Sequence, residues 1–149
     1  MEAEALMDVP VFSDVELFLT TWYRPLLADH PDELLHGFEV DNKEPAKGQF
    51  PAKLLVIRDD GGPSDYFTGE TALGISVLMD NPQRPSDARR ALSLILGMLW
   101  RAPAANAGED PRNPLVSIES INGPFAVPEE QDRARQYGTA SVIVTPEYL

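Results

Sequence analysis

A pair of adjacent carboxylates has the chemistry that a reaction site would use. Asp59 and Asp60 follow an apolar run and come directly before Gly61-Gly62. Two acids at the end of a strand can hold Mg²⁺ or act in general acid–base catalysis. Successive strand residues point to opposite faces of a sheet, however, so we expect these two side chains to diverge. The pattern favours a solvated acidic turn over a metal or catalytic site.

The two histidines, His30 and His36, are six residues apart. This is not the spacing that places two metal ligands on one face of a helix, and it is typical of turn and surface residues. The alternative, a small metal-dependent hydrolase, requires His36 to converge with Asp59 and Asp60 in one pocket. The histidines alone therefore predict no metal site.

The remaining sequence also lacks a catalytic or cofactor-binding pattern. Gly61-Gly62-Pro63 has neither the Lys-Ser/Thr of a P-loop nor the spacing of a dinucleotide site. Gly74-Ile75-Ser76 lacks the second glycine of a nucleophile elbow and lies within a predicted strand. The chain has no cysteine, which removes disulfides, zinc–thiolate sites and thiol catalysis. We therefore expect no enzyme activity, no cofactor and no metal.

Loop aromatic residues and local charge pairs point instead to protein–protein contact. Exposed apolar groups in loops often mark a partner surface. We expect residues 59–69 and 122–135 to be ordered mainly by other subunits, with Arg133 and Arg135 pairing with acids of the adjacent subunit. The candidate interface residues are Asp59, Asp60, Tyr66, Phe67, Phe125, Glu129, Glu130, Arg133 and Arg135.

Length and composition predict one folded domain. The chain has 149 residues, of which 43% are hydrophobic, and it carries a formal net charge of −12. Such acidity disfavours a general grip on nucleic-acid phosphates. No apolar stretch approaches the ~20 residues that span a bilayer, and the acidic N-terminus is unlike a secretory signal. We expect a soluble, cytoplasmic domain over residues 1–149, with a flexible arm at 1–12 and a C-terminal tail at 145–149.

Two amphipathic helices are expected. Ser13 and Glu16 match a capping box that starts the first helix, and Pro25 should kink or end it near Tyr23 or Arg24. Its apolar stripe consists of Val15, Phe18, Leu19, Trp22 and Leu26. Ser86 or Asp87 can cap the second helix. The apolar face of that helix consists of Ala88, Leu92, Ile95, Leu96 and Leu99.

Five extended segments complete the predicted fold. Apolar runs and alternation place strands at 38–42, 53–58, 73–79, 115–121 and 134–144. Asn122-Gly123-Pro124 is expected to form a turn that ends the fourth of them. The order α-β-β-β-α-β-β predicts an α+β domain, with a mostly antiparallel sheet and two packed helices.

Three stretches, together spanning about residues 13–145, resemble the tail terminator proteins of long, non-contractile-tailed bacteriophages, particularly those infecting actinobacteria. The first runs from Val40-Asp41-Asn42-Lys43-Glu44-Pro45 through Gly62, the second is Thr68-Gly69-Glu70, and the third runs from Ile121-Asn122-Gly123-Pro124-Phe125 through Arg135. The α-β-β-β-α-β-β order agrees with the fold of that family.

The resemblance implies a structural virion protein at the head–tail junction, assembled in the host cytoplasm. It would form a homohexameric ring that caps the tail tube, stops its elongation and joins it to the head-completion protein of the neck. Genomic DNA would pass through the lumen without specific binding, and an acidic lumen would repel the DNA backbone. The alternatives are another connector ring, namely a head-closure or adaptor protein, or a host-directed DNA mimic.

Overall fold

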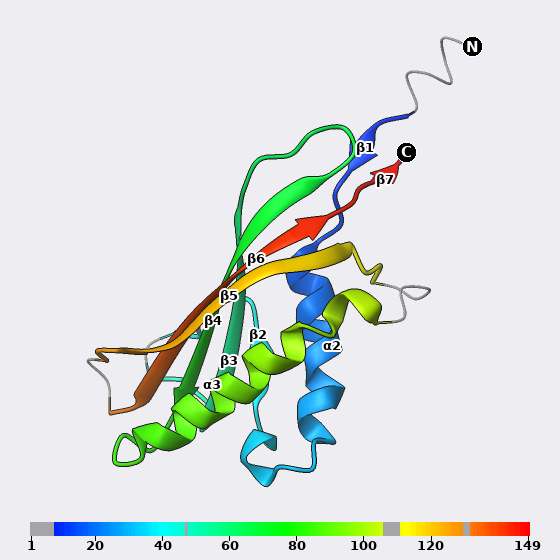
Figure 1. Ribbon diagram of the computed structural model, residues 1–149. Coiled ribbons are helices and arrows are strands. Elements are labelled where there is room, and N and C mark those ends of the chain that lie inside the picture. The colour runs from blue at the N-terminus through cyan, green and yellow to red at the C-terminus, as the bar shows by residue number, and fades with distance from the viewer. Residues whose placement is uncertain (1–7, 47, 106–110, 130–131) are drawn as a thin grey trace.

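The computed structural model describes residues 8–46, 48–105, 111–129 and 132–149. Two helices lie on one face of a five-stranded sheet, and a two-stranded sheet joins the ends of the chain (Figure 1). The elements are β1 Pro10–Val11, α2 Val15–Ala28, the 3-10 turn η1 Glu33–Leu35, β2 Glu39–Asp41, β3 Lys53–Gly61, β4 Gly69–Met79, α3 Pro85–Leu99, the 3-10 turn η2 Ala102–Ala104, β5 Leu115–Val127, β6 Ala134–Val144 and β7 Glu147–Tyr148.

The α+β class predicted from the sequence is confirmed. The large sheet has the strand order β2-β3-β4-β6-β5, in which β2 pairs with β3 in parallel and every other pairing is antiparallel. Its elements follow the predicted α-β-β-β-α-β-β order, and β1 and β7 are added at the ends.

Helix α2 differs from its prediction at the cap, at the proline and in its phase. Asp14, not Ser13, is the N-cap, and its carboxylate accepts a hydrogen bond of 2.9 Å from the Leu17 backbone N. The helix continues past Pro25 to Ala28. Thr21, whose carbonyl would have paired with residue 25, lies on the exposed side, where water can bind that carbonyl. Pro25 therefore does not end the helix, and the predicted alternative, a kink, stays a prediction.

The buried stripe of α2 is rotated from the predicted one. Tyr23 and Leu27 are fully buried, whereas Trp22 is half-buried and Leu26 is exposed. The Tyr23 hydroxyl donates a 2.7 Å hydrogen bond to the backbone oxygen of Ile95 in α3. This buried contact links the two helices that cover the sheet.

Helix α3 has the predicted apolar face but a different start. Arg84 occupies the N-cap without a side-chain hydrogen bond, and Pro85 takes the first helical position, which proline favours. Ser86 and Asp87 therefore lie inside the helix rather than at its cap. All five residues predicted for its apolar face are buried. Within the described residues, no helix has both the length and the apolar character to cross a membrane.

The core lies between the helices and one face of the sheet. Alternate residues of β4, including Leu73, Ile75 and Val77, join the residues of α2 and α3 there. The opposite face is covered at one end by the connection between β2 and β3. In that connection Phe50 packs on a small cluster formed by Leu54, Val56 and Leu78.

Strand β5 passes straight through the position predicted as a turn. It extends from Leu115 to Val127, and the residues from Asn122 to Phe125 form a register shift against β6 instead of reversing the chain. Gly123 has a φ of +112°, and a Cβ there would lie 2.8 Å from the backbone oxygen of Tyr137. The Asn-Gly-Pro sequence thus makes a bulge against a neighbouring strand.

The two ends of the chain pair with each other. Pro10 and Val11, assigned to the flexible arm, pair with Tyr148 and Glu147 of the predicted tail. The Val9 and Leu149 backbones exchange two further hydrogen bonds of 2.9 Å. Each segment is too short to be recognised alone, because two paired residues leave no periodic pattern. The rest of the predicted arm, residues 1–7, lies outside the described residues.

Truncation of Leu96 to Ala should destabilise the fold strongly. Leu96 is 4% exposed and packs directly over Gly138 of β6. Loss of a large buried side chain costs about 2–5 kcal/mol. Leu26→Ala is the matched control, since Leu26 is exposed on α2, and it should cost well under ~1 kcal/mol. Equal unfolding free energies for the two variants in denaturant titrations would contradict this packing.

Candidate interaction surface at the tip of the sheet

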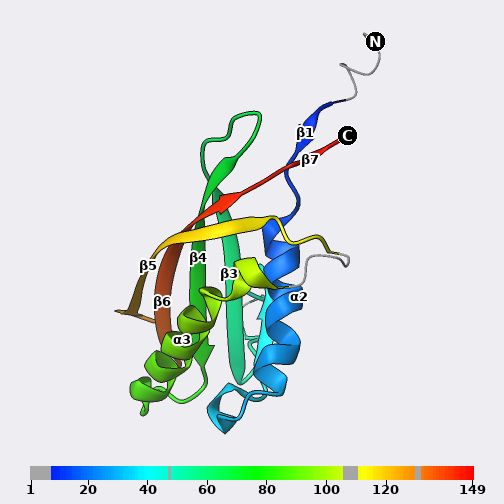
Figure 2. The same ribbon diagram turned by 45° about the vertical axis from the view of Figure 1, so that its right-hand side comes forward.

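The loop before β4 and the tail after β6 leave the sheet together. Strands β4 and β6 are paired as far as Gly69 and Val144, so residues 62–68 and 145–149 emerge at the same end. Figure 2 shows the β3–β4 loop and the β1–β7 ladder side by side beyond the helical layer. Large exposed apolar residues gather there, and we call them the aromatic tip: Val9, Val11, Tyr66, Phe67, Tyr148 and Leu149.

Three aromatic rings organise the tip. The Tyr66 ring centroid lies 5.1 Å from that of Phe67 and 5.2 Å from that of Tyr148. The Tyr148 hydroxyl donates to the backbone oxygen of Tyr66 at 2.8 Å, and the Tyr66 hydroxyl donates to that of Asp8 at 2.9 Å. Phe67, by contrast, is 69% exposed. The rings are fixed by their own chain, and the Phe67 ring is presented to solvent.

Asp65 holds the loop that carries these rings. Its carboxylate accepts hydrogen bonds from the backbone N of Phe67 at 2.7 Å and of Thr68 at 2.8 Å. These backbone N–H groups, Thr68 first and then Phe67, lower the pKa of the Asp65 carboxyl from its usual value. Hydrogen bonds within the chain thus hold the loop at residues 65–68, and the ordering of residues 59–69 by other subunits stays a prediction.

Gly62 allows the loop to fold back closely on the start of β4. A Cβ at this position would lie 2.1 Å from the backbone oxygen of Glu70, a distance that no side chain can accept. The Glu70 backbone N in turn donates to the oxygen of Pro63 at 2.8 Å. Gly62 is needed because backbone passes over backbone, and Gly61-Gly62-Pro63 is a structural turn.

Asp59 and Asp60 diverge, as the strand geometry predicts. The Asp59 carboxylate accepts from the Gly61 backbone N at 2.8 Å and from the Thr71 hydroxyl at 3.2 Å. Asp60 forms a salt bridge of 2.8 Å with Arg58 on the face away from the helices, and this hydrogen bond lowers the pKa of Asp60. The two carboxylates do not share a site.

The histidines form a local turn. The ring Nε2 of His36 lies 2.6 Å from the backbone oxygen of His30, and the His30 ring accepts a hydrogen bond from the Asp32 backbone N. Among the described residues, no three His, Asp or Glu side chains are grouped in a way that could hold a metal ion.

Arg133 and Arg135 bind groups of their own chain, and their predicted pairing with an adjacent subunit stays a prediction. Arg133 donates to the backbone oxygens of Pro51 and Phe50 at 2.9 and 3.2 Å, and its guanidinium lies over the Phe50 ring. Arg135 pairs with Glu44 and with Glu129. Both arginines sit beside the β2–β3 connection and hold it to the sheet, so they serve a structural role.

Of two further predicted interface residues, one is described, and it lies away from the tip. Phe125 is 52% exposed on β5, opposite Tyr137 of β6. Glu130 lies outside the described residues. The sequence prediction missed the tip residues from the two chain ends, which are Val9, Val11, Tyr148 and Leu149. The one signal for them in the sequence was the presence of large apolar residues at both ends of the chain.

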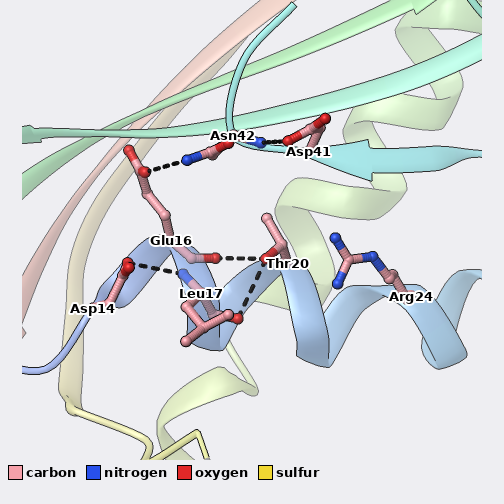
Figure 3. Close-up of a pocket in the computed structure, with 7 residues that line it drawn as sticks. All are labelled: Asp14, Glu16, Leu17, Thr20, Arg24, Asp41 and Asn42. Atoms are coloured by element: carbon pink, nitrogen blue, oxygen red, sulfur yellow. Dashed lines mark hydrogen bonds between the residues drawn. The ribbon is translucent and has the colours of Figure 1, made fainter.

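A pocket of about 200 Å³ lies between the first turns of α2 and the end of β2. Figure 3 shows the Glu16 carboxylate pointing toward Asn42, whose side-chain N donates to it at 3.0 Å. The other carboxylate oxygen accepts from the Asp59 backbone N at 2.6 Å. Because Glu16 is engaged with the chain on both sides, it ties α2 to the sheet, and the pocket is a weaker candidate site than the tip.

No known protein-family model matches this chain, and no curated protein matches it either.

Gly62→Ala should disrupt the tip, whereas Gly97→Ala should not. The Gly62 variant must move backbone atoms of the loop, but a Cβ at Gly97 of α3 meets nothing within 4 Å. Gly97→Ala should stabilise the fold by about 0.5–1 kcal/mol through helix propensity. We expect Gly62→Ala to lower the melting temperature and to increase amide exchange at residues 63–68. Unchanged exchange there would contradict the close approach.

Acid should loosen the tip through Asp65. Because the folded-state pKa of this carboxyl is lowered, its contribution is present above the unfolded-state pKa and is lost as the pH falls through the folded value. The Phe67 and Thr68 amides should therefore exchange faster, relative to the intrinsic rate, as the pH drops below about 4. Asp65→Asn keeps an oxygen acceptor without a charge, so its relative protection should not respond to pH. Amide exchange measured by NMR on the wild-type and Asp65→Asn chains checks this prediction.

Proposed function

We propose that the chain is a structural protein of a long-tailed bacteriophage, a tail terminator that forms a homohexameric ring on the finished tail tube. The ring stops tube growth and presents its other side to the head-completion protein of the neck. The observation that carries the proposal is the aromatic tip, an exposed apolar surface whose loop is held in place by hydrogen bonds within the chain. It is supported by the resemblance of residues 13–145 to tail terminators.

The tip has the properties of a docking surface. Monomeric proteins rarely keep a group of large exposed apolar side chains without a partner, and aromatic anchors carry much of the binding energy of interfaces. Phe67 makes no side-chain hydrogen bond and is the most exposed of the large apolar residues described. Since Asp65 and Tyr148 hold the loop in place, little conformational entropy would be lost on binding.

The charge of the chain fits passage of DNA through a ring. A net charge of −12 per copy gives a repulsive field toward a phosphate backbone. Eight of the described basic residues contact carboxylates or backbone oxygens of their own chain, namely Arg24, Lys53, Arg58, Arg84, Arg90, Arg112, Arg133 and Arg135. A ring lumen built from such a chain would let DNA move without adhering.

Phe67→Ser should give a folded protein that fails to cap tubes. The side chain is exposed, so its removal should leave the melting temperature within a few degrees of the parent. Leu17→Ser, which removes a 49%-exposed residue from α2, is the matched control. In complementation of phage lacking this gene, electron microscopy should show overlong or headless tails for Phe67→Ser and normal particles for Leu17→Ser.

A pull-down separates the terminator from a neighbouring neck ring. The wild-type chain should retain the tail-tube protein, and Phe67→Ser should not. Retention of the portal or an adaptor, without the tube protein, would show that the chain is a different connector. Localisation of the protein away from the head–tail junction in virions would overturn the proposal.

A further inference from the structure

The charges around the aromatic tip are almost all negative. Asp8, Asp65, Glu70 and Glu147 are exposed around it, and the nearby base, Arg112, is partly buried and lies 3.7 Å from Glu147. The tip is therefore an apolar surface with an acidic rim. Its complement is an exposed aromatic or aliphatic surface that has a basic rim.

Helix α3 combines exposed bases with an exposed aromatic residue on its outer side. Arg84, Arg89, Arg90 and Arg101 lie on or beside this helix and are exposed, and Trp100 at its end is 54% exposed. We call these five residues the α3 surface. Two of its arginines form ion pairs, Arg84 with Asp87 and Arg90 with Asp32. Arg89 makes no ion pair with any residue that the structure describes, so the surface keeps an excess of positive charge.

One copy cannot bring its own two surfaces together. Figure 1 shows the tip beyond the end of the sheet, whereas α3 crosses the body below it. The tip of one copy can reach the α3 surface of another, which leaves a free tip and a free α3 surface at the two ends of the pair. Such a head-to-tail contact closes into a ring when the rotation per copy permits.

We propose that the acid-rimmed aromatic tip of one copy binds the arginine-rich α3 surface of the next copy, with Phe67 packing beside Trp100 and Gly97. The proposal rests on the ring that the proposed function requires, and it assigns the two surfaces that form each junction. Charge complementarity selects the orientation, because tip against tip or α3 against α3 brings like charges together. The exposed rings supply the apolar contact area.

The absence of cysteine from the chain allows a direct test by disulfide cross-linking. Thr68→Cys and Gly97→Cys place thiols on the two surfaces and leave Phe67 in place; Thr68 is exposed beside Phe67, and the Gly97 position has open space around an added Cβ. A disulfide forms where the two Cα atoms come within about 7 Å. Under mild oxidation the double variant should give a ladder of covalent oligomers, whereas an equal mixture of the two single variants should stop at a linked dimer.

The controls separate this contact from random collision. Thr68→Cys combined with Val116→Cys, an exposed residue of β5, should give no ladder. Adding Arg89→Glu to the Thr68→Cys/Gly97→Cys chain should abolish its ladder, whereas Lys43→Glu, a charge reversal at another exposed base, should leave it intact. Raising the salt from 0.1 to 1 M shortens the Debye length from about 10 to about 3 Å and should slow cross-linking.

A double variant that stays monomeric under oxidation, or a ladder equal to that of the Val116→Cys control, would overturn the proposed contact. A ladder from a chain that cannot cap tail tubes would support this contact and overturn the proposed function. Capped tubes whose rings contain no 68–97 link would support the proposed function and overturn the contact.

Discussion

The uninterrupted pairing of β4 with β6 is the constraint on which the rest of the structure depends. The register runs from Gly69 opposite Val144 to Met79 opposite Ala134 with no shift. Along this pair, alternate side chains enter the core beneath α2 and α3, and the other half face away. Because the pairing reaches the first residue of β4 and the last of β6, the preceding loop and the following tail must emerge together. The aromatic tip is therefore a consequence of register, and its rigidity comes from the central strands.

The face of the sheet that α2 and α3 do not cover is partly covered by other groups of the chain. At one end the β2–β3 connection lies on it, with Phe50 packed on apolar strand residues and Arg133 stacked on that ring. Further along, the Arg58 guanidinium and the Tyr137 hydroxyl lie across Gly74, where a Cβ would be 2.6 Å from Arg58 and 2.9 Å from Tyr137. Gly74, which resembles part of a nucleophile elbow in the sequence, thus lies beneath the ends of two side chains that an added Cβ would displace. Local ion pairs and small residues make this face compatible with water.

The sequence was sufficient for features that repeat along the chain and insufficient for single contacts. Alternation over eleven residues placed β6 at its observed limits, and helical periodicity gave the buried face of α3. The effect of Pro25 depends on whether the carbonyl of Thr21 is exposed. The effect of Pro124 depends on which strand lies opposite. The sequence alone shows neither. Phe50, Pro51 and Glu44 could not be found as partners of Arg133 and Arg135 because they are more than 80 positions away in the sequence, whereas Glu129, the other partner of Arg135, is six positions away. The tip itself unites both chain ends with an internal loop, and no local pattern encodes that meeting.

Net charge imposes a final requirement on any assembly of this chain. Two copies that each carry −12 repel on average, and the repulsion grows as more copies join. Association then needs a contact at which the two surfaces carry opposite charges although each copy is negative overall. It also needs buried apolar area, whose contribution salt does not screen. Eight of the described basic residues are already bound by carboxylates or backbone oxygens of their own chain. Two of these, Arg84 and Arg90, belong with Arg89 and Arg101 to the four arginines on or beside one exposed helix. Positive charge is concentrated on one surface, and apolar area with acids on another. Copies of this strongly acidic protein therefore attract each other in one relative orientation. The remaining surfaces stay mutually repulsive, and that asymmetry favours one ordered contact over indiscriminate aggregation.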